Sequence, residues 1–220
     1  MRGLPVCSIL LEPGGIPASE GGGGKACRAG GCLVTGQEGV LTDRGRQWWF
    51  IGCVAFAAFM TELDSSIVYI SLPTIARYFN VSPSLVAWVV LAYLLIQTNT
   101  MLLFGKLADV VGLKRIFVAG YAVFIAGSLL CGLSQGIAML IFSRCVQAIG
   151  GAMIVTSGYA LVPRYLPKEI LGTAFGILGT AAAVGVVVGA PVGGFITGLI
   201  SWHWIFLINV PVGRGAVVAA

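Results

Sequence analysis

Charged residues are scarce in this sequence. Asp, Glu, Lys and Arg together make up 10% of its 220 residues, whereas a soluble domain carries about 25%. Hydrophobic residues make up 58%, and the mean hydropathy is +0.97. So few charges cannot cover a surface that faces water. The composition excludes an ordinary soluble domain and predicts a chain that is solvated mostly by lipid.

Histidine is almost absent too, and the cysteines lack the spacing of a metal site. His203 is the only histidine, and none of the six cysteines forms a CxxC or zinc-finger pair. No nucleophile–base pair stands out either. We therefore expect no enzyme, no metal site and no cofactor. The formal net charge of +5 does not indicate nucleic acid, because the cations form short clusters between long apolar runs.

Residues 1–46 differ in composition from the rest of the chain. This segment is rich in glycine, contains Pro5, Pro13 and Pro17, and shows no sustained periodicity. Such a segment buries too little apolar area to offset its ordering entropy, so we predict a disordered N-terminal region. A start codon assigned too far upstream, with the native protein beginning near Val40, is an alternative explanation.

Residues 47–220 are predicted to form a transmembrane helical bundle, which makes the chain an all-α membrane protein. A helix needs about 20 apolar residues to cross about 30 Å of hydrocarbon. The expected helices lie near 48–72, 84–104, 116–133, 136–162, 172–199 and 204–220. We expect the sixth helix to be cut off by the end of the chain.

The loops between these helices differ in charge, which predicts their orientation. Cations precede the first helix and fill the loops after the second and fourth helices: Arg44, Arg46, Lys106, Lys114, Arg115, Arg164 and Lys168. The alternate loops offer Arg77 and His203. By the positive-inside rule the N-terminus should face the cytoplasm.

Three charged residues, Glu62, Asp64 and Arg144, stand out inside the expected helices, where charges are rare and costly. Asp64 in the first helix and Arg144 in the fourth each lie roughly 12 Å below the outer boundary, at about 1.5 Å per residue. At a matched depth they can pair, or alternate between pairing and proton exchange; a purely structural ion pair is the alternative. Glu62 points about 200° away from Asp64, and which of the two carboxylates titrates stays open.

The segment after the second helix runs from Gly105 to Arg115 and contains Asp109, Gly112 and Lys114. Glycines at both ends allow a tight turn, and Asp109 can accept charge-assisted hydrogen bonds. From the residues alone, this segment is a positively charged cytoplasmic loop.

The fifth expected helix is crowded with small residues. Gly185, Gly189 and Gly193 recur every four residues, which puts them on one stripe where another helix can approach closely. Pro191 and Gly194 lie in the same stretch, and we expect Pro191 to loosen the helix on that seam. Close packing alone explains the glycines, whereas the proline suggests a place where helices bend or slide.

Taken together, these segments resemble the major facilitator superfamily, and within it the fourteen-helix drug:proton antiporters. Gly105–Arg115 is similar to the G-x-x-x-D-x-x-G-x-K/R-K/R loop motif, and Leu63–Pro73 to the first-helix motif L-D-x-T-I-V-N-x-A-L-P. Arg144–Gly151, which includes Gln147, resembles the fourth-helix motif R-x-x-Q-G/A-x-G-G. Gly185–Gly194 resembles G-x-x-x-G-x-P-x-G-G, and Trp202–Pro211 resembles a W-R-W-I-F…N-x-P run.

The resemblance implies an N-terminal six-helix bundle and a role for each motif. Asp64, Glu62, Arg144 and Gln147 would line a cavity tied to proton coupling, and the Gly105–Arg115 motif would belong to a cytoplasmic gate. The glycine motif with Pro191 would form a flexing interface. Tyr69 stands where Asn is usual and Val110 replaces a basic residue, so the usual substrate contacts and one gate ion pair depart from the pattern.

The function implied is a proton-coupled antiporter that exports small hydrophobic or cationic compounds across a cell membrane, with the bacterial inner membrane the expected location. The proton gradient would supply the energy, and the partners would be the lipid bilayer, the small-molecule cargo and a second helical bundle that this chain lacks. A transporter of a specific metabolite from the same superfamily and a non-transporting membrane fragment or scaffold are the alternatives.

Overall fold

The computed structural model describes residues 41, 43–199, 201–211 and 213. Its described elements are the helices α2 (Arg44–Phe79), α3 (Pro83–Val111), α4 (Leu113–Gly132), α5 (Ile137–Tyr165), η1 (Lys168–Ile170), α6 (Leu171–Leu199) and α7 (His203–Leu207). Within this described part, five helices are long and apolar enough to cross a membrane. The all-α membrane fold expected from the sequence is therefore confirmed.

The long helices begin and end at residues suited to those positions. The Asp43 side chain accepts a hydrogen bond from the Gly45 amide at the start of α2, and Ser82 accepts one from the Leu85 amide at the start of α3. Asn80 adopts a left-handed conformation after α2. Gly112, with a φ of 107°, joins α3 to α4, a turn that favours glycine because other residues rarely adopt positive φ.

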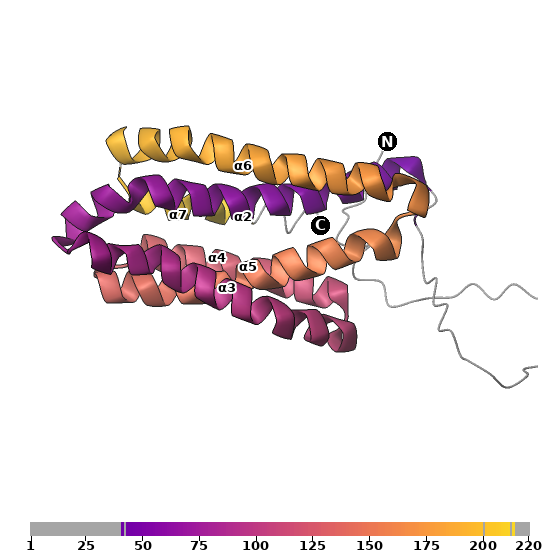
Figure 1. Cartoon of the computed structure of the whole chain (residues 1–220), viewed down its shortest axis with the longest axis horizontal. Coiled ribbons are helices and arrows are strands. Elements are labelled where there is room, and N and C mark those ends of the chain that lie inside the picture. Colours follow the sequence, from indigo (N-terminus) through magenta and orange to yellow (C-terminus); the bar gives the residue numbers. More distant parts are fainter. Residues whose placement is uncertain (1–40, 42, 200, 212, 214–220) are drawn as a thin grey trace, which may run out of the picture.

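The long helices run antiparallel along the chain and form two groups (Figure 1). In the view of Figure 1, α6 lies along α2, whereas α3, α4 and α5 lie together on the other side of α2. Three clusters of buried apolar side chains hold the groups together, one of which joins α2 to α6 and the C-terminal end of α5. The short helix α7 packs against α4 and α2.

Large apolar side chains cover much of the outside of this bundle. Leu102 on α3, Phe142 on α5 and Val187 on α6 are 80%, 67% and 71% exposed. A surface of this kind is unfavourable in water but is solvated by lipid tails. The outer surface therefore agrees with the membrane environment that the composition predicts.

The first and last expected segments differ from the observed ones. The helix α2 begins at Arg44, so residues 44–46 are helical rather than disordered as we expected; the cap at Asp43 fixes this earlier start. The rest of the expected disordered region, residues 1–40, lies outside the described residues. The helix α7 ends at Leu207 and residues 209–211 form a further helical turn, while residues 214–220 of the expected sixth helix are also outside the described part.

Candidate functional site: a buried ion pair and its surroundings

A buried ion pair joins the middle of α2 to the N-terminal third of α5. Arg144 Nη1 lies 2.6 Å from Asp64 Oδ2, and the two side chains are 1% and 0% exposed. Taking two charges out of water is costly, and their attraction offsets that cost only when the geometry is good and further hydrogen bonds complete it. The surroundings of the pair therefore decide what it can do.

Gln147 connects both members of the pair. Its Oε1 accepts a 2.6 Å hydrogen bond from Arg144 Nη1, and its Nε2 donates to Asp64 Oδ1 at 3.0 Å. The same Nε2 lies 2.7 Å from the hydroxyl of Ser128 on α4. Three residues of this network, Asp64, Arg144 and Gln147, are among those that the sequence singled out, and the structure brings them together.

Other residues of the network were missed by the sequence analysis. Asn209, just after α7, donates a hydrogen bond to Asp64 Oδ1, so the network draws on α2, α4, α5 and the segment after α7. The rings of Tyr93 on α3 and Phe206 on α7 face the Arg144 guanidinium. Asn209 belongs to the N-x-P run and could have been found there; Ser128 and Tyr93 carry no local signal.

Glycines allow α4 to approach α5 closely enough for this network. A Cβ placed on Gly127 would lie 2.6 Å from the Cα of Gln147, and one placed on Gly120 would lie 2.8 Å from the Cβ of Met153. Any larger side chain would force the helices apart. Gly127 directly precedes Ser128, so the close approach places that hydroxyl beside Gln147.

Glu62 takes no part in the buried network. It is half-buried, whereas Asp64 two residues later is fully buried, which matches the opposite faces expected from helical geometry. A Cβ on Gly185 of α6 would lie 3.3 Å from the Glu62 Cβ. Glu62 therefore flanks the contact between α2 and α6, on a different side of α2 from Arg144.

The glycine stripe of α6 faces α2, as its four-residue spacing indicates. A Cβ on Gly185 would lie 2.6 Å from the Phe59 carbonyl oxygen, and one on Gly189 would lie 2.6 Å from the Ser66 Cβ. A Cβ on Gly193 would lie somewhat farther away, 3.1 Å from the Ile67 carbonyl oxygen. These three glycines are buried and let the two helix backbones meet almost directly.

Pro191 and Gly194 do not lie on this seam, so the expectation for Pro191 is wrong. Both are exposed, and a Cβ on Gly194 would meet nothing within 4 Å. Pro191 is two residues from Gly189, about 200° around the helix, which turns it away from α2. The helix α6 continues through Pro191 to Leu199.

The expected loop from Gly105 to Arg115 is mostly helical. The helix α3 extends to Val111 and α4 begins at Leu113, so Gly112 alone makes the turn and the predicted turn at Gly105 is wrong. Gly105 instead lies inside α3, where its missing Cβ leaves room beside Thr156 of α5.

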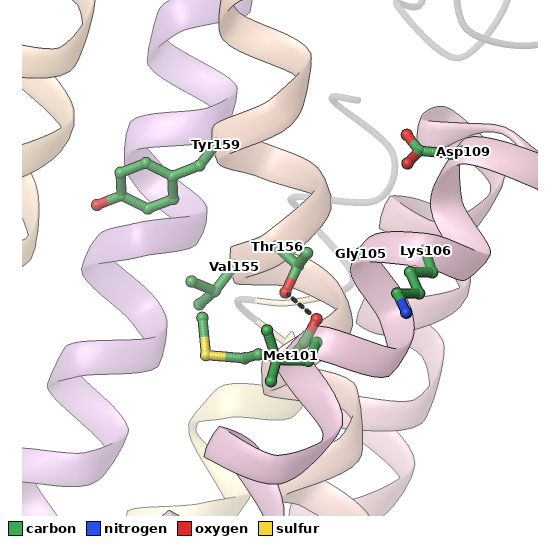
Figure 2. Close-up of a pocket in the computed structure, with 8 residues that line it drawn as sticks. Met101, Gly105, Lys106, Asp109, Val155, Thr156 and Tyr159 are labelled. Carbon is green, nitrogen blue, oxygen red and sulfur yellow. Dashed lines mark hydrogen bonds between the residues drawn. The ribbon is translucent and has the colours of Figure 1, made fainter.

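A groove of about 910 Å³ opens between α3 and α5 beside this motif. Figure 2 shows Gly105, Lys106 and Asp109 along one wall and Thr156 and Tyr159 along the other. Asp109 and Arg115 are exposed, Lys114 is partly buried, and its ammonium lies 4.8 Å from the centre of the Tyr165 ring. Two charged residues of the motif, Lys106 and Asp109, thus line an open groove, whereas Lys114 and Arg115 lie outside its lining.

The buried pair contains one carboxylate, Asp64, which is held by Arg144, Gln147 and Asn209. Among the described residues, no group of three or more His, Cys, Asp or Glu side chains is arranged to hold a metal ion. Ionisable groups inside membrane helices commonly mark proton or substrate pathways.

Two solved structures show the same arrangement of helices. A bacterial homologue of the human lysosomal transporter Spinster, in an inward-facing and unoccupied conformation, matches with a TM-score of 0.67 over 80% of this chain and 42% of its own. The peptide transporter POT matches with a TM-score of 0.68 over 83% of this chain and 38% of its own. Their identities of 17% and 18% support the fold alone.

Curated relatives are considerably closer in sequence. The riboflavin transporter RibZ of Clostridioides difficile is 40% identical over 78% of this chain, and the putative multidrug resistance protein MdtD of Pectobacterium atrosepticum is 40% identical over 79%. The chain spans 38% and 37% of the length of these two relatives. The sequence model described as Major Facilitator Superfamily matches residues 54–220. With its spanning helices and these relatives, the chain is a multi-pass membrane protein that belongs to the Major Facilitator Superfamily.

Proposed function

We propose that this chain supplies the N-terminal bundle of a proton-coupled antiporter that exports small hydrophobic or cationic compounds. The observation that carries the proposal is the sealed Asp64–Arg144 pair, because a fully buried carboxylate that can take a proton couples a charge change to helix packing. Relatives named as multidrug resistance proteins support the cargo class. Transport, rather than an enzymatic reaction, is the activity that follows.

A second helical bundle completes the transporter in this proposal. Transporters of this kind rock two bundles around a site near the midplane. The groove between α3 and α5, with Lys106 and Asp109 on its rim (Figure 2), offers an open contact surface for part of that second bundle. This chain joined to its second bundle is the complete transporter.

The charge distribution supports an inward-facing N-terminus. Arg44, Lys106, Arg115 and Arg164 lie at one end of the antiparallel bundle, where α2 begins and α3 and α5 end. The opposite end carries Arg77 and His203. Burial lowers the pKa of His203 below its usual value, so this ring is neutral at neutral pH and adds no positive charge there. The positive-inside rule then assigns the Arg44 end to the cytoplasm, with a bacterial inner membrane as the proposed location.

The decisive test is Asp64→Asn in the complete transporter, reconstituted in vesicles with an imposed pH gradient. We expect transport of a lipophilic cation dye to fall to the level of empty vesicles, because Asn keeps the hydrogen-bonding shape but cannot take a proton. Glu62→Gln is the matched control and should retain gradient-driven transport. Undiminished transport by the Asp64→Asn variant would refute the assignment.

Export of one specific metabolite is the second candidate, and the 40% identity to a riboflavin transporter favours it. The two candidates predict different cargo profiles in the same vesicles. A multidrug exporter should move several unrelated cations, each competing with the others, whereas a metabolite exporter should move riboflavin or a similar planar compound and ignore the dyes. A chain that moves neither, even with its second bundle, would be a membrane scaffold.

A further inference from the structure

A run of four polar residues interrupts the apolar helix α3 at its centre. Gln97, Thr98, Asn99 and Thr100 follow one another, and Gln97 lies midway between the two ends of the helix. A polar side chain at this depth in a membrane is costly unless it meets a cavity, another protein group or its own backbone. The partner of each side chain therefore indicates what it faces.

Three of these four side chains bond to their own helix. The hydroxyls of Thr98 and Thr100 donate hydrogen bonds of 2.8 and 2.6 Å to carbonyl oxygens one turn earlier. The Asn99 amide donates one of 2.7 Å to the Leu95 carbonyl oxygen. The Gln97 side chain is the exception, because it is partly exposed and forms no hydrogen bond within the described part of the chain. Its amide is left to bond to something else.

The Gln97 amide projects into a space that Gly151 of α5 leaves open. A Cβ placed on Gly151 would lie 3.4 Å from Gln97 Nε2 and 2.9 Å from the Tyr93 hydroxyl oxygen. Two polar groups of α3 thus converge on one point of α5 where a side chain is missing. Gly151, Tyr93 and Gln97 together form the Gly151 niche.

Tyr93 connects this niche to the buried ion pair. Its ring faces Arg144, whose Cζ lies 4.1 Å from the ring centre, and its hydroxyl interacts with the Ser65 hydroxyl of α2. The Ser65 hydroxyl donates its own proton to the Thr61 carbonyl oxygen, so Tyr93 is the donor to Ser65 and its oxygen is left able to accept. A group in the niche would meet that acceptor together with the donor and the acceptor of the Gln97 amide.

The Gly151 niche is recessed between α3 and α5. Tyr93 is 1% exposed and Gly151 is buried, whereas Thr98, the residue after Gln97, is exposed. The side of another helix would touch the exposed side chains of α3 first, but a small molecule with a projecting polar group can reach the recess. The shape therefore favours a small molecule as the occupant.

We propose that the Gly151 niche binds a hydrogen-bonding group of the cargo and that Gln97 is the residue that selects for it. This inference rests on the proposed transport function. Aromatic compounds with amino, hydroxyl or carbonyl groups are the chemical class that fits, since an amide both donates and accepts. The central position of Gln97 matches the midplane depth at which such transporters hold their cargo. A cargo without such a group would leave the amide unpaired and gain nothing from it.

The test compares two lipophilic cations in vesicles that contain the complete transporter and an imposed pH gradient. Ethidium carries aromatic amino groups, whereas tetraphenylphosphonium has no hydrogen-bonding group. In Gln97→Leu we expect the KM for ethidium to rise about three- to tenfold, the range of one lost hydrogen bond, and the KM for tetraphenylphosphonium to stay unchanged. Gly151→Ala, whose methyl group would occupy the niche, should shift the two KM values in the same way.

Asn99→Leu is the matched control, because it also removes an amide from α3 but one that bonds to its own helix. Both KM values should stay at the wild-type level in this variant. If Gln97→Leu lowers the melting temperature, Gly151→Ala decides the question.

Two outcomes separate this inference from the proposed function. A wild-type protein that moves both cations, with both KM values unchanged or raised equally in Gln97→Leu, would overturn the inference and leave the transport function standing. Equal increases would indicate that Gln97 contacts the second bundle instead of the cargo. A wild-type protein that moves neither cation would contradict the proposed function, and the inference would fall with it.

Discussion

The helix α2 contacts its neighbours through two faces, one by close packing of the backbone and the other by charged and hydrogen-bonded side chains. Towards α6 it offers backbone and small side chains, and Gly185 and Gly189 approach within van der Waals distance of its main chain. Towards α5 it offers Asp64, which reaches Arg144 through charge and hydrogen bonds. One contact depends on the absence of side chains, and the other depends on particular side chains.

These two faces should respond differently to change. A glycine seam is held by many weak contacts between surfaces of matching shape. Its stability should change little when a polar group is removed but should fall when a side chain is enlarged. A buried charge pair tolerates little loss of either partner, because the remaining charge is left without water and without compensation. The same helix thus combines a face sensitive to volume with a face sensitive to charge.

The largest effect is expected at the charge-bearing face. Arg144→Met keeps an unbranched side chain but leaves Asp64 buried without its counter-ion, a loss of about 3–5 kcal/mol in similar cases. We expect a clearly lowered melting temperature in detergent micelles. Adding Asp64→Asn to this variant should recover much of the loss, since Asn can still bond to Gln147 and Asn209. An Arg144→Met protein that melts like the wild type would show that the pair contributes no stability.

A smaller effect is expected at the glycine seam. In Gly189→Ala the new methyl group would lie 2.6 Å from the Ser66 Cβ, and overpacking of this kind costs about 1–3 kcal/mol. Gly194→Ala is the matched control: Gly194 directly follows the seam residue Gly193, but a Cβ placed on it would meet nothing within 4 Å. It should be neutral or stabilising by up to about 1 kcal/mol. Equal melting temperatures for both variants would mean that the seam is loose enough to absorb a methyl group.

Local spacing in the sequence was sufficient to identify the seam but not all of its details. The interval of four residues between Gly185, Gly189 and Gly193 defines one helical face whatever the partner helix is. By the same helical spacing, Pro191 falls on the opposite face from Gly189. The expectation that Pro191 lies on the seam is wrong because it treats every residue of the motif as part of one face. The expectation of a turn at Gly105 rests on the conformational freedom of glycine, whereas in the structure Gly105 lies inside α3, beside Thr156 of α5.

The charge-bearing face was predictable only in part. A charged residue inside an apolar run stands out, so Asp64 and Arg144 were identified, and their matched depth suggested the pair. Ser128 and Tyr93 are uncharged and belong to different segments, so nothing local marks them, whereas Asn209 is marked only by its place in the N-x-P run. Their role depends on how the elements that carry them pack around Asp64 and Arg144, which a single sequence does not specify.

The smallest effect tests whether the seam really depends on shape rather than on side-chain bonding. The Ser66 hydroxyl donates a 2.7 Å hydrogen bond to the Val186 carbonyl oxygen of α6, and such bonds between membrane helices average about 0.6 kcal/mol. Ser66→Ala should therefore reduce the free energy of unfolding in mixed micelles only slightly. Ser71→Ala is the control, since that hydroxyl bonds within α2, to Ile67. If Ser66→Ala proves as damaging as Gly189→Ala, polar bonding holds both faces of α2, and the contrast between them fails.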